Sequence, residues 1–137
     1  MTDTLDVDML EAGINLLRAV PGLTVYESPL PNPMPSPPFV AVRGTVSWPD
    51  DPDGMSLDGL VSRAIVRWFT YSVGETQRAA WEVAQLVRGA LLNVRPVIAG
   101  MLPGFIRDDF EGEPDPDETT GDVLVTVTHT YRLTCDS

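Results

Sequence analysis

Prolines crowd one short segment near the start of the chain. Six of the ten residues from Pro29 to Pro38 are proline, within the stretch ESPLPNPMPSPPFV. Proline lacks the backbone N–H donor and has a fixed φ, so neither a helix nor an inner strand can pass through such a segment. We therefore expect residues 28–38 to form an extended, polyproline-like loop outside any sheet. Regular structure must come from the segments on either side of it.

The chain is long enough for one domain with a hydrophobic core. Its 137 residues, 43% of them hydrophobic, predict a single domain spanning 1–137. No apolar run approaches the roughly 20 residues that cross a bilayer. The acidic start MTDTLDVDML lacks the features of a signal or transit peptide. We expect a protein that is soluble, is not exported and does not bind a membrane.

Hydrophobic periodicity predicts two main helices. In LDVDMLEAGINLLRAVPG, residues at spacings of three and four form an apolar stripe, which consists of Val7, Leu10, Ile14 and Leu17. In SVGETQRAAWEVAQLVRGALLN, Ser72 and Glu75 have the spacing of a capping box, S-x-x-E. The apolar stripe of this second helix consists of Ala80, Val83, Ala84, Val87 and Leu91.

Strand-like segments separate the two helices and follow the second. They are LTVYE, FVAVRGTVSW, SRAIVRWFTYSV, parts of VIAGMLPGFIRDDF, and DVLVTVTHTYRLTC. The third is apolar on both faces and predicts a central strand, whereas the last alternates apolar and polar residues like a half-exposed antiparallel strand. We predict an α+β fold: a mostly antiparallel or mixed sheet of about four strands with two main helices packed on it.

Two acidic segments, residues 49–56 and 111–121, predict solvated loops. Clustered carboxylates can bind calcium or magnesium, but PDDPDGMSLDGL lacks the ligand spacing of a calcium loop. The single histidine, His129, and the single cysteine, Cys135, cannot form a zinc site of the usual kind. No catalytic or phosphate-binding motif is present in the sequence. We therefore expect no catalytic residues, no metal, no cofactor and no enzymatic activity.

The overall charge disfavours specific binding to nucleic acid. The net charge is −11, and the nine basic residues, all arginine, are scattered along the chain. A phosphate-binding surface requires clustered cations. What remains is a compact body with long loops rich in proline and acidic residues, which favours a subunit of an assembly.

Three features are candidates for contacts between subunits. The proline segment is a candidate arm, because it has little conformational freedom to lose on binding; its residues are Pro29, Pro31, Pro33, Pro35 and Pro37. The alternative is a crossover loop within the subunit. Trp48 is a candidate exposed anchor. Arg67, on a largely apolar strand face, requires a carboxylate partner or access to solvent; Asp50 or Asp51 of a neighbouring subunit is a candidate partner.

The layout of the chain resembles the tail terminator, or tail completion, proteins of long-tailed bacteriophages, particularly siphophages of actinobacteria. An initial helix leads to VYESPLPNPMPSPPFVAVRG, which is similar to the family's strand, proline-bearing loop and next strand. RAIVRWFTYSVGETQRAAWEVAQLVRGALL resembles its central strand and following helix. The family pattern in this segment matches Ser72, Gly74, Ala80, Ala84, Val87 and Leu91. The closing strand, ending in YRLTC, is also similar.

This resemblance implies a structural virion protein at the neck between head and tail, assembled in the host cytoplasm. Such a protein forms a homo-oligomeric ring, expected to be a hexamer, that caps the tail tube and ends its polymerisation. Its partners are the tail-tube protein and the head-closure or connector protein. Genomic DNA passes through the lumen of the ring without specific binding.

Three other functions remain open from the sequence. The nearest is another neck protein, a head-closure or head–tail joining subunit. A small metal-dependent enzyme that uses the acidic clusters is a second, and it predicts binding of calcium or magnesium by the monomer. An adaptor whose proline segment binds a proline-recognising partner is a third, although the segment lacks the flanking basic residues that such ligands often carry.

Overall fold

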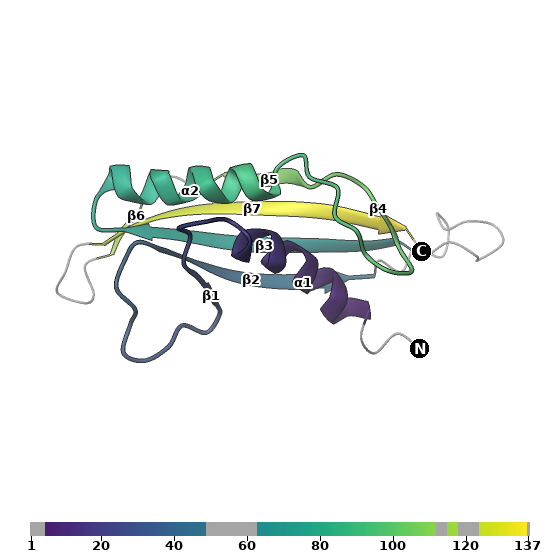
Figure 1. Ribbon diagram of the computed structural model, residues 1–137, viewed down its shortest axis with the longest axis horizontal. Coiled ribbons are helices and arrows are strands. Elements are labelled where there is room, and N and C mark those ends of the chain that lie inside the picture. The colour runs from purple at the N-terminus through teal and green to yellow at the C-terminus, as the bar shows by residue number, and fades with distance from the viewer. Residues whose placement is uncertain (1–4, 49–62, 112–114, 118–123, 137) are drawn as a thin grey trace.

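A computed structural model describes residues 5–48, 63–111, 115–117 and 124–136 of the chain (Figure 1). This part of the chain forms two helices and a seven-stranded sheet. The elements in chain order are α1 (Leu5–Arg18), β1 (Val25–Glu27), β2 (Phe39–Ser47), β3 (Arg63–Gly74), α2 (Gln77–Leu91), β4 (Leu102–Pro103), β5 (Arg107–Glu111), β6 (Asp115–Asp117) and β7 (Leu124–Asp136). The predicted α+β class is confirmed.

Three long strands form the middle of the sheet. The strand order is β1-β2-β3-β7-β4, and β5 and β6 also pair with β7. Strand β1 is parallel to β2, whereas all the other pairs are antiparallel. The count exceeds the predicted four because β4, β5 and β6, each only two to five residues long, pair in turn with the edge of β7 that faces away from β3.

Helix α1 confirms the first predicted helix and its stripe except at Val7: Ile14 and Leu17 are buried, and Leu10 is partly buried against the core. The buried residues are Met9, Gly13, Ile14 and Leu17, and the predicted stripe residue Val7 is 49% exposed. The reason is the position of Trp68 on β3, whose indole Nε1 donates a hydrogen bond to the Leu10 carbonyl at 2.9 Å. A Cβ atom at Gly13 would lie 2.6 Å from Trp68 Nε1. The helix therefore presents its glycine, rather than Val7, to the sheet.

The second helix begins four residues later than the capping-box prediction requires. Ser72 is a fully buried residue of β3, which continues to Gly74. The helix is capped instead by Thr76, whose hydroxyl accepts a hydrogen bond from the Ala79 N–H at 3.0 Å. The predicted capping box is therefore wrong, because the strand extends through its first position. The predicted apolar stripe is confirmed, since all five of its residues are buried.

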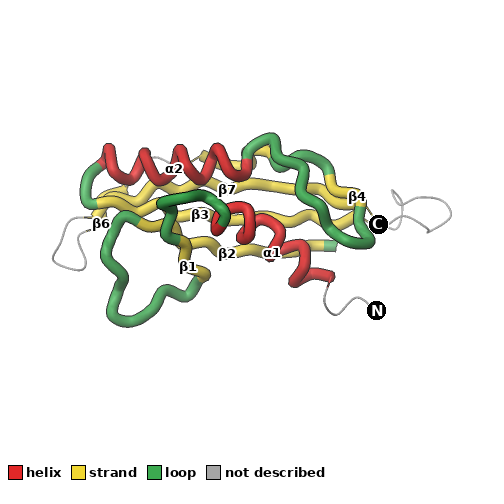
Figure 2. The backbone as a smooth tube through the Cα atoms, in the orientation of Figure 1, coloured by secondary structure: helices red, strands yellow, loops and turns green. Residues whose placement is uncertain are grey.

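Both helices cover the same face of the sheet (Figure 2). The main core forms between them and alternate residues of the long strands, which are Val40, Val42, Ala64, Val66, Trp68, Tyr131, Leu133 and Cys135. The opposite face, here called the outer sheet face, carries the residues of the other parity. On β3, in the middle of the sheet, these are the half-buried Ile65, Arg67, Phe69 and Tyr71.

Only part of the acidic segments lies in the described structure. Residues 49–56 lie outside the described residues. Within 111–121, Asp115–Asp117 forms β6 and pairs with Leu124–Thr126, so the prediction of a loop over that whole segment is wrong there. Backbone pairing with a neighbouring strand does not require apolar side chains, which is why hydrophobicity did not reveal this strand. Neither described helix combines the length and apolar character needed to cross a bilayer.

Candidate interaction surface

The proline segment folds over the outer sheet face. It connects β1 to β2, which are parallel neighbours (Figure 2). Its path starts at Ser28, whose N–H donates to the Val42 carbonyl at 2.9 Å. It bends at 28–29, 32–33 and 37–38, where the Ser28–Pro29, Asn32–Pro33 and Pro37–Pro38 peptide bonds are cis. The segment lies outside the sheet as predicted, but it is looped rather than continuously extended.

Leu30 attaches this segment to the sheet. Its partly buried side chain packs against a small second core on the outer face, which consists of Phe39, Ala41, Val73 and Leu124. Tyr26 of β1 contacts the same cluster, with its ring edge-to-face with Phe39 at a centroid distance of 5.6 Å. Beyond Leu30 the loop projects into solvent at Pro31 and Pro33, which are exposed, and the partly exposed Met34 lies back towards the sheet. The proline segment is thus a crossover within the subunit at its base and a projecting loop at its tip.

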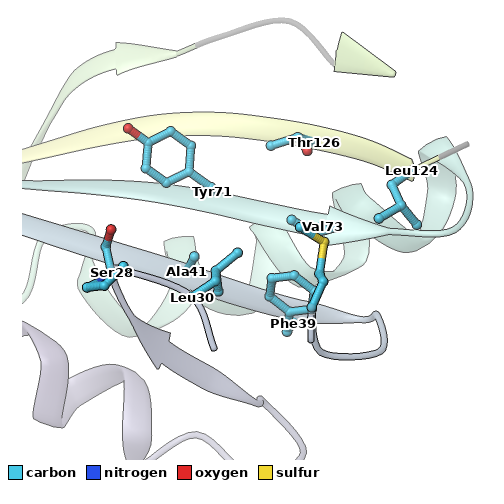
Figure 3. Close-up of a pocket in the computed structure, with 10 residues that line it drawn as sticks. Ser28, Leu30, Phe39, Ala41, Tyr71, Val73, Leu124 and Thr126 are labelled. Carbon is cyan, nitrogen blue, oxygen red and sulfur yellow. The ribbon is translucent and has the colours of Figure 1, made fainter. Parts of the chain in front are cut away.

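A largely apolar pocket of about 400 Å³ lies between the proline segment and the outer sheet face (Figure 3). Its lining residues are Ser28, Pro29, Leu30, Met34, Phe39, Ala41, Tyr71, Val73, Leu124 and Thr126. None of these side chains carries a charge. The pocket therefore offers mainly shape and apolar contact, and its polar side chains are the hydroxyl-bearing Ser28, Tyr71 and Thr126.

The candidate interface residues occupy different parts of this surface. Pro29, Pro31 and Pro33 are exposed, whereas Pro35 and Pro37 are half-buried. Trp48 is 37% exposed. Its Nε1 donates to Asp6 Oδ1 at 2.9 Å, which links the end of β2 to α1. Asp50 and Asp51 lie outside the described residues. The structure therefore does not bring these candidates together into one site.

Arg67 has a carboxylate partner inside its own chain. Its Nε lies 3.1 Å from Asp109 Oδ2, and Arg132 Nη1 lies 3.7 Å from Asp109 Oδ1. The expectation that Arg67 requires a carboxylate is met, but by Asp109 of β5. Arg132 belongs to the last strand, and only the pairing register brings it opposite Arg67. Asp109 lies beside a bulge in β5, where alternation alone does not assign a face.

The other reactive side chains are buried on the helix-covered face. His129 lies between aromatic rings, with centroid distances of 5.9 Å to Trp81 and 6.1 Å to Tyr131. Burial raises the pKa of the Cys135 thiol to about 11, and the neighbouring Asp136 charge acts in the same direction. In the described part of the chain, no three His, Cys, Asp or Glu residues are grouped so that they could hold a metal ion.

Comparison with known proteins gives similarity of fold only. No family model matches the sequence, and no curated protein sequence matches it either. A chain from the structure of the virion of a native gene transfer agent particle superposes with a TM-score of 0.69 at 16% identity, covering 96% of each chain. A second solved structure, which carries no functional name, superposes with a TM-score of 0.55 at 17% identity and covers 94% of each chain.

Proposed function

We propose that this protein is a structural subunit of a phage-like virion and that it acts there as a tail terminator. In this role a hexameric ring of the protein caps the tail tube, ends its polymerisation and provides the surface that joins tail to head. The observation that carries the proposal is the near-complete fold correspondence with a chain of a gene transfer agent virion. The proposed role is structural, without catalysis or a cofactor.

The strand–helix junction supports the more specific part of the proposal. This junction carries the sequence resemblance to tail terminators, and its small residues have a physical reason. A Cβ atom at Gly74 would lie 2.7 Å from the Ala79 carbonyl carbon. Ala80 and Ala84 are buried against β7, in a cluster with Val127. The pattern therefore corresponds to a helix that packs unusually close to the end of a strand.

The exposed surface is suited to assembly. Met34 in the proline segment, Trp48 at the end of β2 and Phe105 before β5 are each more than one-third exposed. Methionine and aromatic residues are over-represented in protein interfaces. In the proposed ring, the tip of the proline segment contacts the neighbouring subunit or the tail tube, and Trp48 contacts a neighbour. DNA passes through the lumen without being bound.

The mass of the purified protein in solution tests this proposal. We would measure it by light scattering on a sizing column, alone and then with tail-tube protein. A species of ring size that forms alone or on addition of tube protein is the expected result. Copurification with portal or adaptor protein but not with tube protein would indicate the alternative neck role, head closure. A monomer that binds neither partner would refute both roles.

A further inference from the structure

Three arginines lie side by side across the outer sheet face. Arg67 of β3 pairs in register with Arg132 of β7, which pairs in turn with Arg107 of β5. Residues that face each other across neighbouring strands point to the same side of a sheet. The next residue, Asp108, forms an ion pair with Arg88 of α2 at 3.2 Å, so it points to the helix-covered side and Arg107 to the outer side. We call these three residues the arginine row.

The arginine row is only partly neutralised within the chain. Asp109 is the carboxylate shared by Arg67 and Arg132. Arg107 donates to the neutral amide oxygen of Asn93 at 2.7 Å. No described carboxylate forms an ion pair with Arg107. Like charges directly opposite each other destabilise a sheet, so an acidic partner would stabilise the row. A row of excess positive charge is unusual in a chain with a net charge of −11.

Exposed apolar residues continue the surface at one end of the row. Phe105 is 48% exposed, and the Arg107 guanidinium lies 5.6 Å from its ring centroid. Arg95 lies on the same ring at 6.0 Å, and its Nε donates to the Pro103 carbonyl. Leu102 is 65% exposed and pairs with Asp136 of β7. Aromatic residues and arginine are both enriched in protein interfaces.

Helix α1 carries a surface of the complementary kind. Its solvent side presents Val7, Asp8 and Glu11, all exposed, and neither acid forms an ion pair with a described residue. The helix packs over β2 and β3, whereas the arginine row ends at β5, on the other edge of the sheet (Figure 1). One subunit therefore has a basic aromatic surface on the outer sheet face, reaching one edge, and an acidic surface with Val7 on the helix-covered side, towards the other edge.

We infer that these two surfaces bind each other between copies of this chain. The arginine row and Phe105 of one copy dock on Val7, Asp8 and Glu11 of the next. Because the two surfaces differ, the contact is head-to-tail, and repeating it closes a ring or extends a filament. The inference rests on the proposed function, which includes the ring. It adds the identity of the two surfaces that form the contact between subunits. Charge complementarity of this kind also speeds association, and this attraction weakens as the salt concentration rises.

Charge reversal on each surface tests the contact. Arg107→Glu and Glu11→Arg each place like charges at the contact and should each lower the self-association constant at least tenfold. Mixing the two variants should restore association between unlike copies, because each then supplies the charge that the other lacks. Arg78→Glu is the matched control, since Arg78 is an exposed arginine on α2, outside both surfaces. Light scattering with and without tail-tube protein, at low and high salt, measures all four proteins.

The possible results distinguish the interface from the function. If the wild type forms a ring and both Arg107→Glu and Glu11→Arg still form it, the inferred interface is wrong but the proposed ring stands. If Arg107→Glu no longer binds tail-tube protein but self-associates normally, the inference is wrong about the partner. The arginine row then binds an acidic partner rather than a second copy of this chain. A wild type that stays monomeric under all conditions overturns the interface and the proposed ring together. Circular dichroism of each variant confirms that loss of association is not loss of folding.

Discussion

Replacing Gly13 with alanine should destabilise the protein, although alanine is the better helix former. The new Cβ atom would lie 2.6 Å from Trp68 Nε1, well inside van der Waals contact. The indole cannot move aside easily, because it is fully buried and hydrogen-bonded to the Leu10 carbonyl. Overpacking of this kind typically costs about 1–3 kcal/mol, and a weakened hydrogen bond costs about 0.5–1.5 kcal/mol more.

The gain in helix propensity offsets only part of this cost. Alanine is favoured over glycine inside a helix by about 1 kcal/mol, which leaves a net loss of about 0.5–3.5 kcal/mol in the free energy of unfolding. Urea unfolding followed by tryptophan fluorescence measures the change. With a denaturant slope of about 2 kcal/mol per molar, a loss in the middle of that range lowers the urea midpoint by about 1 M.

Gly89 provides the matched control for this experiment. It lies in α2 and is exposed, and a Cβ atom placed there would meet no atom within 4 Å. Gly89→Ala should therefore gain the helix propensity alone and raise the urea midpoint by about 0.3–0.5 M. If Gly13→Ala raised the midpoint as Gly89→Ala does, the close approach of α1 to Trp68 would be refuted.

Four further results are expected. Thr76→Ala should cost about 1 kcal/mol in thermal unfolding, since it removes the cap of α2; an unchanged melting temperature would contradict that assignment. Burial raises the pKa of the Cys135 thiol to about 11, so at pH 8 a disulfide reagent should modify it at least about a hundredfold more slowly than in urea; equal rates would contradict its burial. Asp109→Asn should cost about 1 kcal/mol by leaving the arginine row without its carboxylate, and this cost should shrink in salt; a salt-independent cost would argue against repulsion. Met34→Ser should weaken assembly at only a small cost in monomer stability, because Met34 lines the pocket but is 45% exposed, whereas Leu30 holds the loop to the sheet; normal assembly would exclude Met34 as a contact.

The sequence predicted those elements in which one local signal dominates. The run SRAIVRWFTYSV, apolar on both faces, predicted β3, and the apolar stripe within 77–91 predicted α2, although not the residue at which α2 begins. The stripe of α1 was wrong at Val7 and did not include Gly13, because the packing of Gly13 on Trp68 joins two residues 55 positions apart. Local capping signals failed in the same way at Ser72, since whether a serine caps a helix depends on where the preceding strand ends.

The candidate interaction surface was less predictable because it depends on pairing between distant strands. The need of Arg67 for a carboxylate followed from its sequence, but the identity of Asp109 did not. Nothing in the sequence sets Arg132 opposite Arg67, or Arg107 opposite Arg132, until the register is known. The nine basic residues look scattered along the chain, yet three of them are neighbours on one face.

The pairing of β7 also constrains when the protein can fold during synthesis. Strand β3 is 12 residues long and pairs along its whole length with β7, which begins 50 residues after β3 ends. At translation rates of about 5–20 residues per second, the ribosome needs about 3–10 s to add those residues. Throughout that interval one edge of an apolar central strand has no partner, and such edges promote aggregation. Slower synthesis between residues 74 and 124 would lengthen this exposure, so the yield of soluble protein should depend on translation speed in that interval.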